Sequence, residues 1–218
     1  MRTFEHIYNL IISPESLFIA WKRFSRDKHK KKDVLQFEWN LEQNIFALCR
    51  ELKNKVYQHG PYTDFYITDP KQRHIHKALV RDRVLHHSIV RILTPIFEPT
   101  FIANSFSCRI GKGTHKGVLM VEKMLRTVSR NNTRSCYVLK CDIRRFFDSI
   151  DHNILLKMLE QKIKDPAVMW LLERIVSSYE REGEREEKLR GERDTRWQSH
   201  LPIVCEYLYE QVRSVCKA

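Results

Sequence analysis

The feature of this sequence that most constrains its fold is an apolar run that ends directly on an acidic residue. Residues 137–141 read YVLKC, and Asp142 follows at once. β-branched and aromatic residues without Gly or Pro are typical of a buried strand, and we predict one over residues 135–143. A carboxylate there would cost stability unless a metal ion or a cation paired with it. Asp142 is therefore the first candidate functional residue.

The preceding part of the chain alternates between helical and extended patterns, which predicts an α+β fold. Apolar residues recur at helical spacing across residues 14–55 and again across residues 80–99. Between them, residues 60–78 alternate aromatic and polar side chains around Gly-Pro and Asp-Pro breaks. That pattern predicts a strand, a turn and a second strand.

Three later helices have recognisable start signals. Thr114 follows a loop of small residues and can cap the helix after it. A second helix is expected to begin near residues 149–151. Asp165 and Pro166 form the pair expected at the N-cap and first position of a third helix.

The chain is strongly basic, and this favours a polyanionic partner. Lys and Arg number 39 against 27 Asp and Glu, so the formal net charge is +12. Nucleic acid is the commonest polyanion that such a charge attracts.

The six cysteines and the apolar runs indicate the compartment. The cysteine spacing contains no C-x-x-C pair and suggests neither a zinc site nor a disulfide framework. Reduced thiols are then the expectation. No signal-peptide pattern begins the sequence, and no apolar run is long enough to cross a membrane. We therefore expect a cytoplasmic protein without a membrane partner.

The carboxylates after the predicted strand suit metal-dependent phosphoryl transfer. Mg²⁺ is held by one or two carboxylates together with phosphate oxygens, and two such ions can clamp the attacking and leaving oxygens. Asp142 has the required place at a strand end, and the backbone carbonyl of Ile143 could also face the metal. Asp148 can be read as a ligand or a helix cap, whereas a cap is the better reading of Asp151.

These residues resemble a known family. The segment YVLKCDIRRFFDSIDHNILLKML looks like the first palm motif of bacterial reverse transcriptases of the retron, diversity-generating retroelement and group II intron kind. Residues 66–118 resemble the fingers and upper-palm motifs of the same enzymes, and the likeness covers roughly residues 14 to 180. The resemblance implies right-hand polymerase fingers and a partial palm, helix-rich, with an incomplete antiparallel palm sheet.

The resemblance also implies roles for the site residues. Asp142 would be the first metal-binding aspartate, for Mg²⁺, and Phe147 the steric gate that excludes a ribose 2′-hydroxyl. Lys77, Arg81 and Arg83 are candidates for the triphosphate of a dNTP or for the template backbone.

Other cations have weaker indications. Arg83 could instead form an ion pair with Asp82 or another acid. Arg109, Lys112 and their glycine-containing loop could approach the phosphates of an RNA template. The implied partners are an RNA template, a DNA or RNA primer and dNTPs.

The resemblance divides the chain into four parts. They are an N-terminal helical region (1–59), fingers and upper palm (60–134), the first half of the palm (135–180) and a poorly defined tail (181–218).

The tail has the character of an out-of-frame translation. The family's next motifs, a glycine-proline-glycine loop and a Tyr-x-Asp-Asp hairpin, are missing, and no Asp-Asp pair occurs in the chain. Codons permitted for residues 191–218, read one base later, allow GKGIPVGNLTSQLFANIYMNKFDQFVK, which resembles the missing loop and its helix. We hypothesise a frameshift between about Tyr179 and Gly191.

The sequence thus predicts a truncated reverse transcriptase fragment without polymerase activity of its own. An alternative is a non-catalytic RNA-binding module whose affinity falls with salt. A less favoured one is a metal-dependent nuclease using Asp142, Asp148 and Asp151.

Overall fold

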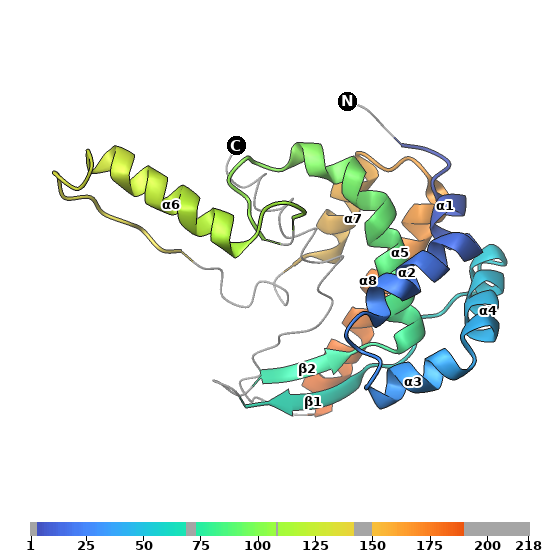
Figure 1. The fold of residues 1–218 in the computed structure, drawn as a ribbon. Helices are drawn as coiled ribbons and strands as arrows, with labels where there is room; N and C mark the ends of the chain where they lie inside the picture. Colours follow the sequence, from blue (N-terminus) through green and yellow to red (C-terminus); the bar gives the residue numbers. More distant parts are fainter. Residues whose placement is uncertain (1–3, 69–72, 108, 142–149, 190–218) are drawn as a thin grey trace.

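The chain forms a helix-rich α+β structure in which most helices share one core (Figure 1). The structure is a computed structural model that describes residues 4–68, 73–107, 109–141 and 150–189; for 73–74 and 179–189 it describes the backbone alone. The elements, in chain order, are α1 (Tyr8–Ile12), α2 (Pro14–Ser25), α3 (Lys32–Trp39), α4 (Leu41–Lys53), β1 (Thr63–Ile67), β2 (Arg73–Lys77), α5 (Val80–Phe97), the short 3₁₀-helix η1 (Glu98–Thr100), α6 (Thr114–Val128), α7 (His152–Glu160) and α8 (Pro166–Leu189).

The core is built around α5. Helices α1, α2, α3 and α4 all contact it, and α7 packs on α8. Leu17 and Ala20 of α2 and Leu85 and Ile89 of α5 are completely buried. Trp21 and Phe24 are buried in the same cluster as these residues, so these aromatics of α2 form part of the core.

The N-terminal segment is fixed to the loop between α7 and α8. Phe4 donates its backbone N–H to the Lys162 carbonyl at 3.0 Å and accepts from Lys164 at 2.9 Å. The Asp165 carboxylate accepts from the Tyr8 backbone at 2.9 Å and from Ala167 at 3.0 Å. The predicted N-cap of α8 is confirmed, and it also anchors the start of α1.

The predicted strand–turn–strand over residues 60–78 is confirmed as an antiparallel hairpin. Strands β1 and β2 pair with Phe65 opposite Ile75. Every residue of β1 is exposed, whereas Ile75 and His76 of β2 are buried. The end of the hairpin where Lys77 leads into α5, which we call its foot, lies next to α3 (Figure 1).

The strand predicted over residues 135–143 is not formed in the described residues 135–141. This stretch has no regular secondary structure, and Tyr137 and Leu139 are 99% and 88% exposed. A strand is stable only when a neighbour pairs with it, and the described part of the chain provides none here. The apolar residues are present, but the described part of the chain provides no buried surroundings for them.

The cap predicted at Thr114 is wrong by one position. Gly113 is the N-cap of α6 and Thr114 is its first residue. Gly113 has φ of 99° and donates its N–H to the Phe106 carbonyl at 3.0 Å. This left-handed conformation, which closes the loop, favours glycine over a capping hydroxyl.

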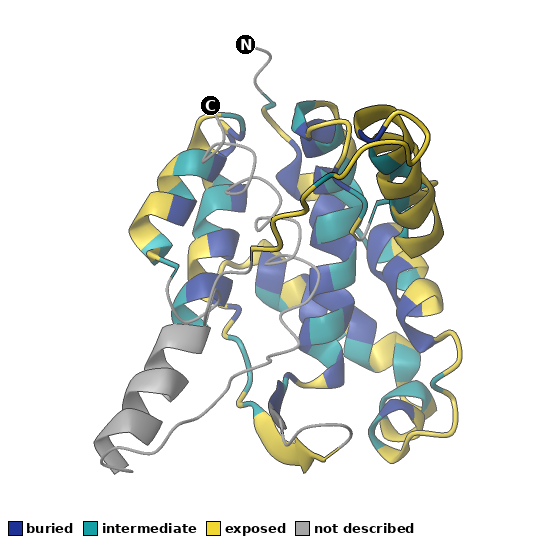
Figure 2. Cartoon of the chain, turned by 90° about the vertical axis from the view of Figure 1, so that its left-hand side faces the viewer, coloured by how far each residue is buried: buried dark blue, intermediate teal, exposed yellow. Residues whose placement is uncertain are grey.

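Helix α6 stands apart from the core. It contains no buried residue, and Figure 2 shows the helix and the segment that follows it as mostly exposed. Core residues come from each of the predicted regions 1–59, 60–134 and 135–180. The boundaries of these regions stay a prediction.

Candidate nucleic-acid interface

Two of the candidate phosphate-binding cations meet at one carboxylate at the foot of the hairpin. Asp33, at the start of α3, accepts from the Lys77 ammonium at 2.7 Å and from the Arg83 guanidinium at 2.5 Å. Burial opposes ionisation of Asp33, but the hydrogen bonds from Lys77 and Arg83 outweigh it and lower the pKa of the carboxyl. The ion pair joins α3, β2 and α5, and it clusters two positive charges beside the basic turn that precedes α3.

Arg83 was expected to form an ion pair with Asp82 or another acid, and in the structure it pairs with Asp33. Asp82 instead accepts from Arg81, Nε to Oδ1, at 3.3 Å. Arg81 also makes a two-pronged contact to Glu51 of α4, with both distances 3.0 Å. Burial lowers the pKa of Arg81, but Glu51 and Asp82 more than offset this and raise it overall.

Asp82 is the buried acceptor that connects Arg81 to Tyr57 and to Gly60. It is fully buried and accepts from the Tyr57 hydroxyl at 2.8 Å and from the Gly60 backbone at 3.0 Å. A Cβ on Gly60 would lie 2.4 Å from Leu79 Cδ1, so only glycine allows this approach without a shift. Burial, with the nearby Asp82 charge, raises the pKa of Tyr57. The network fixes the segment before β1, which includes Tyr57 and Gly60, to Asp82 of α5.

Arg109 and Lys112 stabilise the loop between η1 and α6. Arg109 is only 8% exposed; it donates to Glu98 at 2.7 and 2.9 Å and to two loop carbonyls. Lys112 donates to the Ala103 carbonyl and lies over the Phe106 ring. Both side chains shape the loop as it stands, and contact with template phosphates stays a prediction for them.

The residues expected to hold the metal lie outside the described residues. These are Asp142 and Ile143; the ambiguous carboxylate Asp148 and the predicted steric gate Phe147 also lie outside them. Asp151 is described, and its carboxylate accepts from the backbone of Asn153 and Ile154 at 2.8 and 3.0 Å. The interpretation of Asp151 as the cap of α7 is confirmed.

No group of three or more metal-binding side chains occurs within the described ranges. Among these residues there is also no helix long and apolar enough to cross a membrane. The cysteines Cys49, Cys136 and Cys141 are free thiols.

Sequence reasoning missed the acids that pair with the candidate cations. Asp33 and Glu51 lie 50 and 30 residues from Arg83 and Arg81, so no local pattern joins them. The helix that became α6 was predicted, but the cationic side chains that it exposes were not singled out.

Comparison with known proteins gives a consistent picture. No family model matches the chain. It is 27% identical over 141 residues to nuclear intron maturase 1, mitochondrial, of Arabidopsis thaliana, and 29% over 143 residues to YkfC of Escherichia coli K12. It is 25% identical over 175 residues to the group II intron-encoded protein LtrA of Lactococcus lactis. These matches cover 63%, 65% and 78% of the chain but 18%, 36% and 28% of the relatives.

The fold and these similarities agree with the resemblance seen in the sequence. The chain is related to the group II intron maturases and reverse transcriptases. Nuclear intron maturase 1 and LtrA are intron proteins by name, and the chain spans only 18–36% of the length of the relatives named here.

Proposed function

We propose that this chain is the fingers and first palm part of a reverse transcriptase of the group II intron kind, and that it binds RNA. The observation that carries the proposal is the similarity to LtrA, which extends over 78% of the chain. The hairpin and the clustered arginines at its foot support it, because cationic side chains on rigid elements suit phosphate binding.

The family reaction is the template-directed addition of dNTPs to a primer 3′-end, with Mg²⁺ supplying charge stabilisation at the phosphates. Asp142 and the Ile143 carbonyl would hold the metal, since hard oxygen donors are what Mg²⁺ prefers. Phe147 would lie under the sugar. Lys77 and Arg83 would bind the incoming nucleotide after exchanging Asp33 for phosphate.

Arg81 is likewise proposed to bind the triphosphate of the incoming nucleotide. Its contacts to Glu51 and Asp82 hold the guanidinium at the foot of the hairpin. Arg109 and Lys112 would support the loop proposed to follow the template. A cytoplasmic location is part of the same proposal.

For the chain alone we propose RNA binding without polymerisation, because the sequence carries no Asp-Asp pair to complete a two-metal site. The test is a binding assay with a labelled RNA, run beside a primer-extension assay with dNTPs and Mg²⁺. Binding that weakens with salt is the expected result. Undetectable binding at low salt would refute the proposal.

The nuclease alternative is separated by one substitution. Asp142→Asn should leave RNA affinity within about twofold, because phosphate contacts come from Lys and Arg. Metal-dependent cleavage of the RNA by the unsubstituted chain, abolished in Asp142→Asn, would support the nuclease instead.

A further inference from the structure

Helix α6 exposes cationic side chains on one side and valines on the other, with Leu119 among the cations. At about 100° per residue, Lys123 and Arg126 fall on the same side of the helix, and Arg130 follows just beyond its end, after the C-cap Ser129. Val121 and Val128 fall on the other. Each of these side chains is exposed. The helix thus presents a cationic stripe, formed by Lys123, Arg126 and Arg130, to solvent.

The charge of this stripe is largely uncompensated. Arg126 donates to Glu122 at 2.6 Å, and both side chains are at least half exposed. Within the described ranges, Lys123 and Arg130 have no ion-pair partner. This contrasts with Lys77 and Arg83, which share Asp33. Lys123 and Arg130 are therefore among the described cations that an outside anion can reach without exchange of an internal partner.

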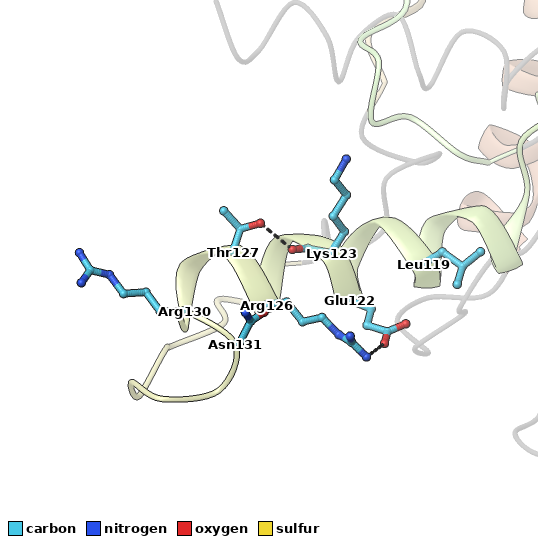
Figure 3. A pocket seen from close by; sticks show the side chains of 7 residues that line it. All are labelled: Leu119, Glu122, Lys123, Arg126, Thr127, Arg130 and Asn131. Carbon is cyan, nitrogen blue, oxygen red and sulfur yellow. Dashed lines mark hydrogen bonds and ion pairs between the residues drawn. The ribbon is translucent and has the colours of Figure 1, made fainter.

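The end of α6 adds a shallow hollow beside the stripe. The open pocket of about 480 Å³ is lined by Leu119, Glu122, Lys123, Arg126, Thr127, Arg130 and Asn131 (Figure 3). Arg130 and Asn131 both have positive φ, 48° and 56°. The Asn131 N–H closes the helix by donating to the Arg126 carbonyl at 2.7 Å. The turn fixes the Arg130 backbone at the rim of the pocket.

We propose that the cationic stripe of α6 binds the phosphate backbone of an RNA strand, at a site separate from the foot of the hairpin. The inference rests on the proposed function, which supplies RNA as the partner. At a rise of 1.5 Å per residue, Lys123 and Arg126 are about 4.5 Å apart along the helix axis, comparable to the spacing of about 3.4 Å between phosphates along one strand of a duplex, and Arg130 extends the stripe beyond the helix end. No aromatic residue occurs in α6, so backbone contact is expected rather than base stacking.

The same composition argues against a lipid surface. Interfacial helices place Trp, Phe or Leu on the apolar face, whereas the apolar side of α6 is mainly valine, with Leu125 and Met124 beside it and no Trp or Phe. An acidic polypeptide would lack the regular spacing of phosphates. RNA is thus the occupant that the stripe fits best.

The test compares two variants with equal change of charge. One is Lys123→Glu/Arg130→Glu, which leaves the Arg126–Glu122 pair intact. The control is Arg50→Glu/Lys53→Glu in the last turn of α4, where both side chains are exposed. Affinity for a labelled 20-nucleotide oligouridylate is measured by fluorescence anisotropy with the full chain over a series of salt concentrations. Circular dichroism and the unfolding midpoint check that both variants fold.

The α6 variant should bind at least about tenfold more weakly at 50 mM salt, and its slope of log affinity against log salt should fall by about 1.4, at about 0.7 for each phosphate contact of a single strand. The α4 control should stay within about twofold. Equal weakening of both variants, or none in the α6 variant, would overturn this inference while RNA binding by the unsubstituted chain stands.

Two other results are informative. No binding by the unsubstituted chain would overturn the proposed function and this inference together. Competition by phosphatidylserine vesicles or polyglutamate as effective as that by unlabelled RNA, at equal charge, would also overturn the inference, because it would assign the stripe to another polyanion.

Discussion

Arg83 donates to Asp33 at 2.5 Å, across 50 residues of sequence, and Asp33 also holds Lys77. One carboxylate thus pairs with two of the three cations proposed to bind a nucleotide. The pair is part-buried, so salt screens it less than a surface contact. A phosphate that binds here must displace Asp33 or share its partners.

Removal of this carboxylate should strengthen phosphate binding. In Asp33→Asn, Lys77 and Arg83 lose their shared acid, and affinity for RNA at low salt should rise several-fold. Asp27→Asn removes the same charge from a neighbouring exposed residue without releasing a paired cation. Anisotropy measurements on both variants separate release of the cations from a change in net charge. An equal gain in both would place the phosphates elsewhere.

The buried contact between Tyr57 and Asp82 should matter for stability more than for binding. Tyr57→Phe removes the 2.8 Å hydrogen bond and leaves a buried carboxylate with one partner fewer, at a cost of about 1–3 kcal/mol. Asp82→Ala leaves the Gly60 N–H and Arg81 with a lost partner and should cost about 3–5 kcal/mol. Urea denaturation measures both. Costs below about 0.5 kcal/mol would contradict this account of the network.

Two adjacent histidines should make the fold sensitive to acid. Burial, together with the charges of neighbouring His59, His87 and Arg83, lowers the pKa of His86 to about 3. Burial and nearby cations lower the pKa of His87 to about 4. The unfolded chain takes up these protons near pH 6.5. Between pH 6.5 and about 4 the unfolded state binds more protons, so stability falls as pH falls, by up to about 1.4 kcal/mol per pH unit for each histidine.

The substitution His86→Phe tests this dependence. The variant should lose less stability between pH 7 and pH 5 than the unsubstituted chain does, as followed by urea denaturation at each pH. His115→Phe, at an exposed position of α6, serves as the control and should keep the original slope. Identical slopes in all three proteins would show that His86 is not a source of the acid sensitivity.

How far the fold follows from the sequence is clear at particular residues. Asp165 with Pro166, Asp151 before α7 and the breaks around residues 60–78 are local signals, and each formed the predicted structure. Residues 137–139 were predicted to form a buried strand but lie exposed without regular structure, because the burial of a strand depends on neighbours that its own sequence does not encode. The site was predictable as a set of cations, but their pairing was not. Asp33 and Glu51 reach Arg83 and Arg81 only through packing of α3 and α4 beside α5.

The exposed apolar side chains of α6 and of the segment after it should promote self-association. Val121 is 51% exposed and Leu139 88%, and apolar patches of this kind drive aggregation. Val121→Lys/Leu139→Lys should lower binding of the dye ANS and reduce light scattering at equal protein concentration. Unchanged scattering would show that another surface is responsible.

We propose that this chain, a relative of reverse transcriptases, binds RNA but does not copy it. One measurement tests it most directly: a labelled DNA primer annealed to an RNA template, incubated with the full chain, Mg²⁺ and dNTPs, with retention and extension of the primer scored together. The account predicts salt-sensitive retention of the primer–template and no extension. Robust extension, or no retention at low salt, would contradict it.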